Sequence, residues 1–92
     1  MAREAAAPRK QTFKYQAPTA KSVLLVGEFT RWQEKAIPMQ KASDGTWSAT
    51  VALPPGTHPY RFVVDGEWCD DPKCTLRVRN PYGTENMVRQ VV

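Results

Sequence analysis

Residues 56–68, GTHPYRFVVDGEW, constrain the fold more than any other stretch of this sequence. Asp65-Gly66 stands between two runs of β-forming residues. Both residues tolerate the positive φ of a type I′ turn, so the pair predicts a two-residue β-hairpin. In that register Val63 lies opposite Trp68 on the returning strand.

The same register predicts what each face of the hairpin carries. Side chains alternate along a strand, so Tyr60 and Phe62 share one face, and Arg61 and Val63 share the other. Trp68 then lies one diagonal step from Arg61. One face is therefore suited to a core, and the other presents an indole beside a guanidinium.

Turn signals recur along the rest of the chain and separate short runs of β-forming residues. Ninety-two residues make one domain with a modest core. Short strands about every 8–12 residues, with turn signals between them, predict an antiparallel β-sandwich. Besides the hairpin, strands are expected at 11–15, 22–28, 39–41, 46–53, 75–79 and 86–92. The expected core contains Phe13, Tyr15, Leu25, Trp47, Val51, Tyr60 and Phe62.

Residues 1–9 are expected to form a disordered lead-in, and residues 10–92 the folded domain. The first eight residues are small and charged, with nothing to bury and no apolar core of a secretory signal. No stretch reaches the roughly 20 apolar residues of a membrane span. A cytoplasmic protein without a membrane partner is expected.

Catalytic chemistry finds little support in this sequence. The single histidine, His58, falls on the expected core face, and Asp70 and Asp71 are neighbours in a turn. Cys69 and Cys74 lack the partners that a zinc site needs, and are expected to be free thiols. We therefore expect no enzyme activity, no catalytic residue, no metal and no cofactor.

Binding is better supported, because two tryptophans are expected at the surface. Trp47 belongs to the core by alternation, whereas Trp32 lies in a polar loop and Trp68 on the outward face of the hairpin. The apolar face of a pyranose packs flat on an indole, and Arg61 and Asn86 offer hydrogen bonds to its hydroxyls. Two alternatives remain open: the rings could seal a core edge, or they could stack single-stranded nucleic acid.

Charge argues against the nucleic-acid alternative. The net charge of +4 is mild, and the basic residues are scattered along the chain rather than gathered in a stripe. No nucleic-acid partner is expected.

Several ordered blocks of the sequence resemble the family 48 carbohydrate-binding modules. This family includes the glycogen-binding domain of the AMP-activated protein kinase beta subunit and N-terminal domains of isoamylases and branching enzymes. The kinase-type domain is the most similar, over roughly residues 11–92. The blocks are VGEFTRW (26–32), DGTW (44–47), LPPGTHPYRFVVDGEW (53–68), DP (71–72) and NPYGTEN (80–86).

The resemblance implies an immunoglobulin-like, early-set sandwich that binds α-1,4-linked glucan such as glycogen, starch or maltooligosaccharides. The family's stacking pair falls on Trp32 and Trp68. Its basic hydrogen-bonding position falls on Arg61, where the kinase-type domain has lysine. The remaining family contacts fall on Tyr82 (a leucine in the kinase-type domain), Thr84 and Asn86.

The sequence thus predicts a non-catalytic α-glucan-binding module. The alternative is an early-set module that packs on a catalytic domain or kinase-type subunit without binding sugar.

Overall fold

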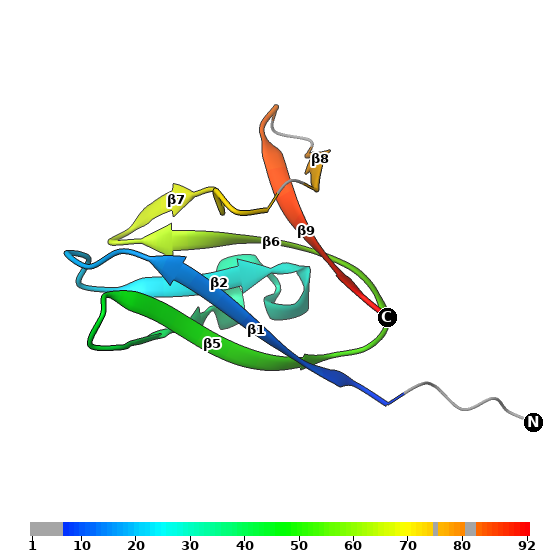
Figure 1. Ribbon diagram of the computed structural model, residues 1–92. Helices are drawn as coiled ribbons and strands as arrows, with labels where there is room; N and C mark the ends of the chain where they lie inside the picture. Colours follow the sequence, from blue (N-terminus) through cyan, green and yellow to red (C-terminus); the bar gives the residue numbers. More distant parts are fainter. Residues whose placement is uncertain (1–6, 75, 81–82) are drawn as a thin grey trace, which may run out of the picture.

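The computed structural model describes residues 7–74, 76–80 and 83–92, and these form two antiparallel β-sheets packed as a sandwich (Figure 1). Within these ranges the smaller sheet has the strand order β1-β5-β4 and the larger has the order β3-β2-β6-β9-β8, with β7 also paired to β6. The predicted all-β, immunoglobulin-like sandwich is confirmed. The strands are β1 (Arg9–Gln16), β2 (Val23–Gly27), β3 (Ile37–Pro38), β4 (Gln40–Lys41), β5 (Thr46–Leu53), β6 (Gly56–Val64), β7 (Glu67–Cys69), β8 (Arg77–Arg79) and β9 (Glu85–Val91).

The hairpin of β6 and β7 forms in the predicted register. Val63 pairs with Trp68 across a turn in which Asp65 and Gly66 have φ of 50° and 87°. The Asp65 carboxylate accepts hydrogen bonds from the backbone N–H groups of Lys21 and Ser22 at 2.8 and 2.9 Å. The hairpin tip is thereby tied to the start of β2.

Aromatic residues from both sheets fill the core, as the alternation predicts. Phe13 and Tyr60 are buried with their rings edge to face, 4.8 Å between centroids. Of the expected core residues, Tyr15 and Val51 are only half-buried, although both pack against the core. Leu25, Trp47 and Phe62 are buried as expected.

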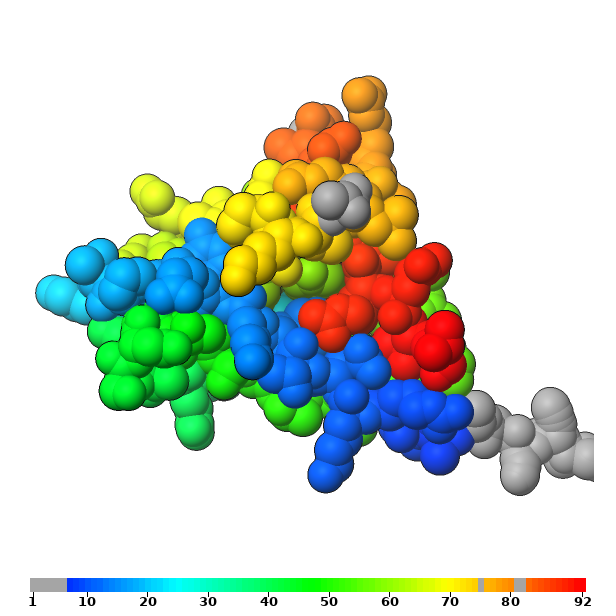
Figure 2. All heavy atoms as spheres, in the orientation of Figure 1, coloured from blue at the N-terminus to red at the C-terminus, as the bar shows by residue number. Residues whose placement is uncertain are grey.

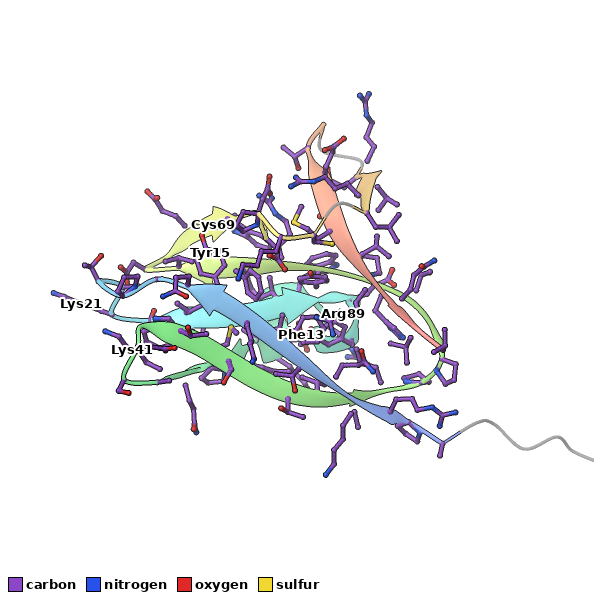
Figure 3. The ribbon with its side chains drawn as sticks, in the orientation of Figure 1. Phe13, Tyr15, Lys21, Lys41, Cys69 and Arg89 are labelled. Carbon is purple, nitrogen blue, oxygen red and sulfur yellow. The ribbon has the colours of Figure 1, made fainter. Side chains whose placement is uncertain are left out.

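Arg89 closes the open side of the sandwich between β9 and β1. Its guanidinium lies over the Phe13 ring at 4.1 Å and donates to the Gln11 side chain and to the Thr12 carbonyl, both at 3.1 Å. Figure 3 shows Arg89 above Phe13, and in Figure 2 the spheres of β1 lie against those of β9. The two sheets are therefore joined by a cation as well as by apolar packing.

The segment that joins the expected strands 22–28 and 39–41, which the sequence predicts as a loop carrying Trp32, is more ordered than expected. It contains two short 3-10 helices, η1 (Glu28–Thr30) and η2 (Trp32–Lys35), followed by β3. These turns pack on the outward face of the larger sheet, where Val26 and Val63 are buried rather than open to solvent. Neither helical turn of the described residues has the length or apolar character to cross a bilayer.

Candidate functional site

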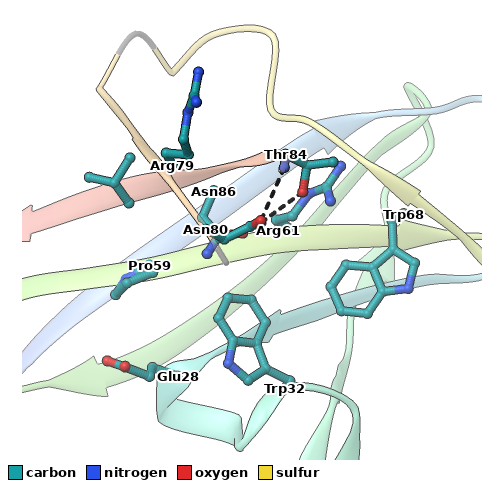
Figure 4. A pocket seen from close by; sticks show the side chains of 10 residues that line it. Glu28, Trp32, Pro59, Arg61, Trp68, Arg79, Asn80, Thr84 and Asn86 are labelled. Carbon is teal, nitrogen blue, oxygen red and sulfur yellow. Dashed lines mark hydrogen bonds between the residues drawn. The ribbon is translucent and has the colours of Figure 1, made fainter. Parts of the chain in front are cut away.

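A groove of about 750 Å³ lies on the outward face of the larger sheet (Figure 4). An aromatic wall comes from η2 and β7, and a polar wall comes from β8, the following turn and β9. The floor is β6. The residues that line the groove are Glu28, Trp32, Pro59, Arg61, Trp68, Val78, Arg79, Asn80, Thr84 and Asn86.

Trp32 and Trp68 form the aromatic wall. Their ring centroids are 6.2 Å apart and their planes are inclined by 42°. Trp68 is 40% exposed at the edge of β7, and Trp32 is half-buried. Two indoles from segments 36 residues apart in sequence thus present one concave apolar surface.

A strained turn holds Trp32 in this place. Arg31 and Trp32 both have positive φ, 53° and 58°, which non-glycine residues rarely adopt. The buried Thr30 hydroxyl accepts a hydrogen bond from the Gly27 N–H at 3.0 Å and lies 2.7 Å from the Trp32 carbonyl, to which it donates. Thr30 therefore ties the end of β2 to the turn that presents the ring.

Arg61 lies beneath Trp68, as the hairpin register predicts. Its guanidinium carbon is 5.6 Å from the centroid of the indole, within the range of a cation–π contact. Its Nη2 donates to Asp70 at 2.9 Å, and a second oxygen of Asp70 accepts from Arg77 at 3.1 Å. The Arg61 guanidinium is thus fixed in place by an ion pair.

Asn80 organises the polar wall. Its side-chain amide nitrogen donates to the Thr84 hydroxyl at 2.7 Å and to the Asn86 side-chain oxygen at 3.1 Å, and its oxygen accepts from the Thr84 N–H at 3.1 Å. The first and third contacts connect Asn80 with Thr84 in Figure 4. Thr84 and Asn86 are thereby fixed relative to each other, although one is exposed and the other buried.

The structure brings five of the six predicted site residues to one groove, and Tyr82 lies outside the described residues. The five are Trp32, Arg61, Trp68, Thr84 and Asn86. Asn80 was not predicted as a site residue; the sequence places it only in the segment between the expected strands 75–79 and 86–92. An asparagine before a proline signals a turn, but nothing local shows that its amide reaches two neighbours.

The other residues with chemically active side chains, His58 and the two cysteines, do not form a second site among the described residues. His58 donates through Nε2 to the Pro54 carbonyl at 2.8 Å. The described residues contain no group of three histidine, cysteine or acidic side chains that could hold a metal. Cys69 and Cys74 are free thiols.

An antiparallel β-sandwich with an open aromatic groove on one sheet is the architecture of a ligand-binding module. Residues 9–92 match the family described as the glycogen recognition site of AMP-activated protein kinase. The chain therefore belongs to this glycogen-recognition family of carbohydrate-binding modules.

Curated relatives agree with the family. The chain is 38% identical over 71 residues to the 5'-AMP-activated protein kinase subunit beta-1 of Sus scrofa, covering 77% of this chain and 55% of that protein. It is 44% identical over 66 residues to subunit beta-2 of Mus musculus, covering 72% of this chain and 23% of the relative. It is 41% identical over 54 residues to "Protein PTST homolog 2, chloroplastic" of Arabidopsis thaliana, covering 59% of this chain and 10% of the relative. The chain thus spans little more than half of the first of these relatives and far less of the others.

Proposed function

We propose that this chain is a non-catalytic module that binds α-1,4-linked glucan in the groove between Trp32 and Trp68. The observation that carries the proposal is the pair of indoles 6.2 Å apart at the surface. A large exposed aromatic surface in a small soluble domain is typical of a binding site. Membership in a glycogen-recognition family supports a glucan as the ligand.

The inclination of the rings favours an α-linked chain. In an α-1,4-glucan successive sugar rings turn relative to one another, so the chain curves, whereas a β-1,4-linked chain is a flat ribbon. Indole planes inclined by 42° offer two contact surfaces to a curved chain. Both surfaces cannot lie flat against one straight ribbon.

The polar wall supplies the hydrogen bonds that the hydroxyls of a sugar need. The Thr84 hydroxyl and the Asn86 amide line the groove opposite the indoles. Since Asn80 holds both, their orientation is set before the ligand arrives, which lowers the entropic cost of binding. In this proposal Arg61, which lies beneath Trp68, also offers hydrogen bonds to the sugar hydroxyls. Tyr82 is kept as a sugar-contacting residue, as the family resemblance implies.

The test is a calorimetric titration of maltoheptaose into the unmodified chain and into Trp68→Ala. An open groove buries little of the ligand, so we expect a Kd on the order of micromolar to millimolar for the unmodified chain. Loss of the indole should weaken binding at least about tenfold. Equal binding by both proteins would refute the site.

Leu76→Ala is a matched control. Leu76 is 42% exposed, about as much as Trp68, but does not line the groove. Its removal should leave the Kd unchanged. Cellohexaose, the flat β-linked counterpart, should bind weakly or not at all to the unmodified chain.

A second candidate function is docking on a kinase-type or catalytic subunit. It is favoured by relatives that are named as subunits of a protein kinase. If docking is the only function, the unmodified chain will bind no maltoheptaose, and the Trp32–Trp68 face will gain protection from hydrogen exchange only when such a subunit is added. Both functions are compatible with a cytoplasmic location, which we also propose.

A further inference from the structure

Asp70 joins an arginine of the groove floor to an arginine of the strand that carries part of the polar wall. One carboxylate oxygen accepts from Arg61 of β6 at 2.9 Å, and the other accepts from Arg77 of β8 at 3.1 Å. Arg61 lies under the aromatic wall, and Arg77 begins the strand that carries part of the polar wall. One carboxylate therefore connects the floor beneath Trp68 with the strand of the polar wall.

Within these walls the two short strands, β7 and β8, have few other attachments. β7, which carries Trp68, pairs with β6 over three residues, and β8 pairs with β9 over three residues. Asp70 lies in the segment that leads from β7 to β8. Short edge pairings leave the separation of the walls poorly determined unless side chains fix it.

The position of Arg61 also depends on Asp70. The Arg61 side chain is only 16% exposed, and its buried Nε has no hydrogen-bond partner among the described residues. A cation that is largely withdrawn from water needs a compensating charge. A neutral glucan does not supply one, whereas Asp70 does.

We propose that Asp70 is a positioning residue for the glucan-binding groove. Its bridge between Arg61 and Arg77 holds the guanidinium against Trp68 and sets the distance between the aromatic and polar walls. This inference rests on the proposed function. The Asp70 bridge differs from a surface ion pair that merely adds stability, because it acts on ligand affinity through the position of Arg61.

The experiment measures the maltoheptaose Kd by calorimetry and the unfolding midpoint for a set of variants. Asp70→Asn removes the charge while conserving the size of the side chain. Glu67→Gln is the matched control, because it removes an exposed carboxylate from β7 that forms no ion pair with the described residues and does not line the groove. Asp70→Glu tests rescue, and Arg61→Met with and without Asp70→Asn tests whether the two residues act together.

We expect Asp70→Asn to weaken maltoheptaose binding about five- to tenfold and also to lower the unfolding midpoint, because it leaves the largely buried Arg61 guanidinium without its counter-charge; the Kd is therefore measured well below the midpoint of every variant. Asp70→Glu should bind within about twofold of the unmodified chain, and Glu67→Gln should bind equally well. In the Arg61→Met background, Asp70→Asn should have less than about a twofold further effect, because the guanidinium that Asp70 holds against Trp68 is already gone. Arg77→Met should weaken binding by itself, which separates the bridge from a simple Arg61–Asp70 pair.

Two results would overturn the inference alone: binding by Asp70→Asn that equals that of the unmodified chain, or an undiminished effect of Asp70→Asn in the Arg61→Met background. Absence of maltoheptaose binding by the unmodified chain would instead overturn the proposed function, and this inference with it.

Discussion

At the scale of single residues, Tyr60 and Asp71 link the core to the segment that follows Trp68. The Tyr60 hydroxyl donates to a carboxylate oxygen of Asp71 at 2.8 Å, and both residues are buried. Burial, and then the hydrogen bond to Asp71, raise the pKa of Tyr60 far above its ordinary value, so the phenol stays neutral and donates. The other Asp71 oxygen accepts from the Lys73 N–H at 3.0 Å.

Replacing Tyr60 with Phe should therefore cost stability without changing the groove. The variant keeps the ring but leaves a buried carboxylate oxygen without its donor. We expect a loss of about 1–3 kcal/mol in the free energy of unfolding, measured by urea denaturation. Tyr15→Phe, at a half-buried tyrosine, is the control and should lose less. A Tyr60→Phe protein as stable as the unmodified chain would contradict the role given to this hydrogen bond.

At the scale of elements, the strands were predictable and the turn before β3 was not. A strand such as β5 follows from local alternation, and the hairpin follows from Asp65-Gly66, because both signals lie within a few residues. The 3-10 turns instead depend on contacts across the fold. Gly27 is extended there, and a Cβ on it would lie 2.6 Å from the Pro59 carbonyl and 2.7 Å from the Phe29 ring.

Gly27→Ala tests this dependence. Both clashes fall on packed groups, so η1 must shift, and η2 with Trp32 must follow. We expect a loss of about 1–3 kcal/mol in unfolding free energy and a several-fold weaker maltoheptaose Kd. Gly66→Ala provides the contrast: its Cβ meets open space, and only its φ of 87° is unfavourable. If Gly27→Ala preserved both stability and affinity, the close packing under η1 would not matter for the site.

The candidate site divides in the same way between predictable and unpredictable parts. Trp68 and Arg61 could be placed together from the register of one hairpin. Asn86 was named from the residues as a hydrogen-bonding group and again from the family resemblance, whereas Thr84 came from the resemblance alone. Asn80, Thr30 and the bridging role of Asp70 escaped prediction, because each depends on partners that only tertiary structure brings into reach.

At the scale of the whole molecule, the net positive charge is not concentrated at the binding groove. The net charge is +4, and of the two arginines that line the groove, Arg61 and Arg79, Arg61 is paired with Asp70. The other basic groups of the described residues do not line the groove, so they do not form one field directed at it. A neutral ligand would gain little from them.

Glucan affinity should consequently be insensitive to salt. We expect the maltoheptaose Kd to change less than about twofold between about 50 and 500 mM NaCl, because no counterions are released from a neutral ligand. Parallel titrations with a single-stranded oligonucleotide serve as the comparison. A steep loss of oligonucleotide affinity with rising salt, together with no glucan binding, would favour the nucleic-acid alternative instead.

The left-handed pair Arg31–Trp32 has a consequence for how this domain can change over time. Each such non-glycine residue costs on the order of 1 kcal/mol, and the rest of a small fold must compensate for both. Substitutions that relax the turn should make the domain more thermostable and at the same time release the ring from its presented orientation. Resistance to heat and readiness to bind are thus opposed at this turn, and a screen for heat-tolerant variants that ignores the ligand should select against the groove.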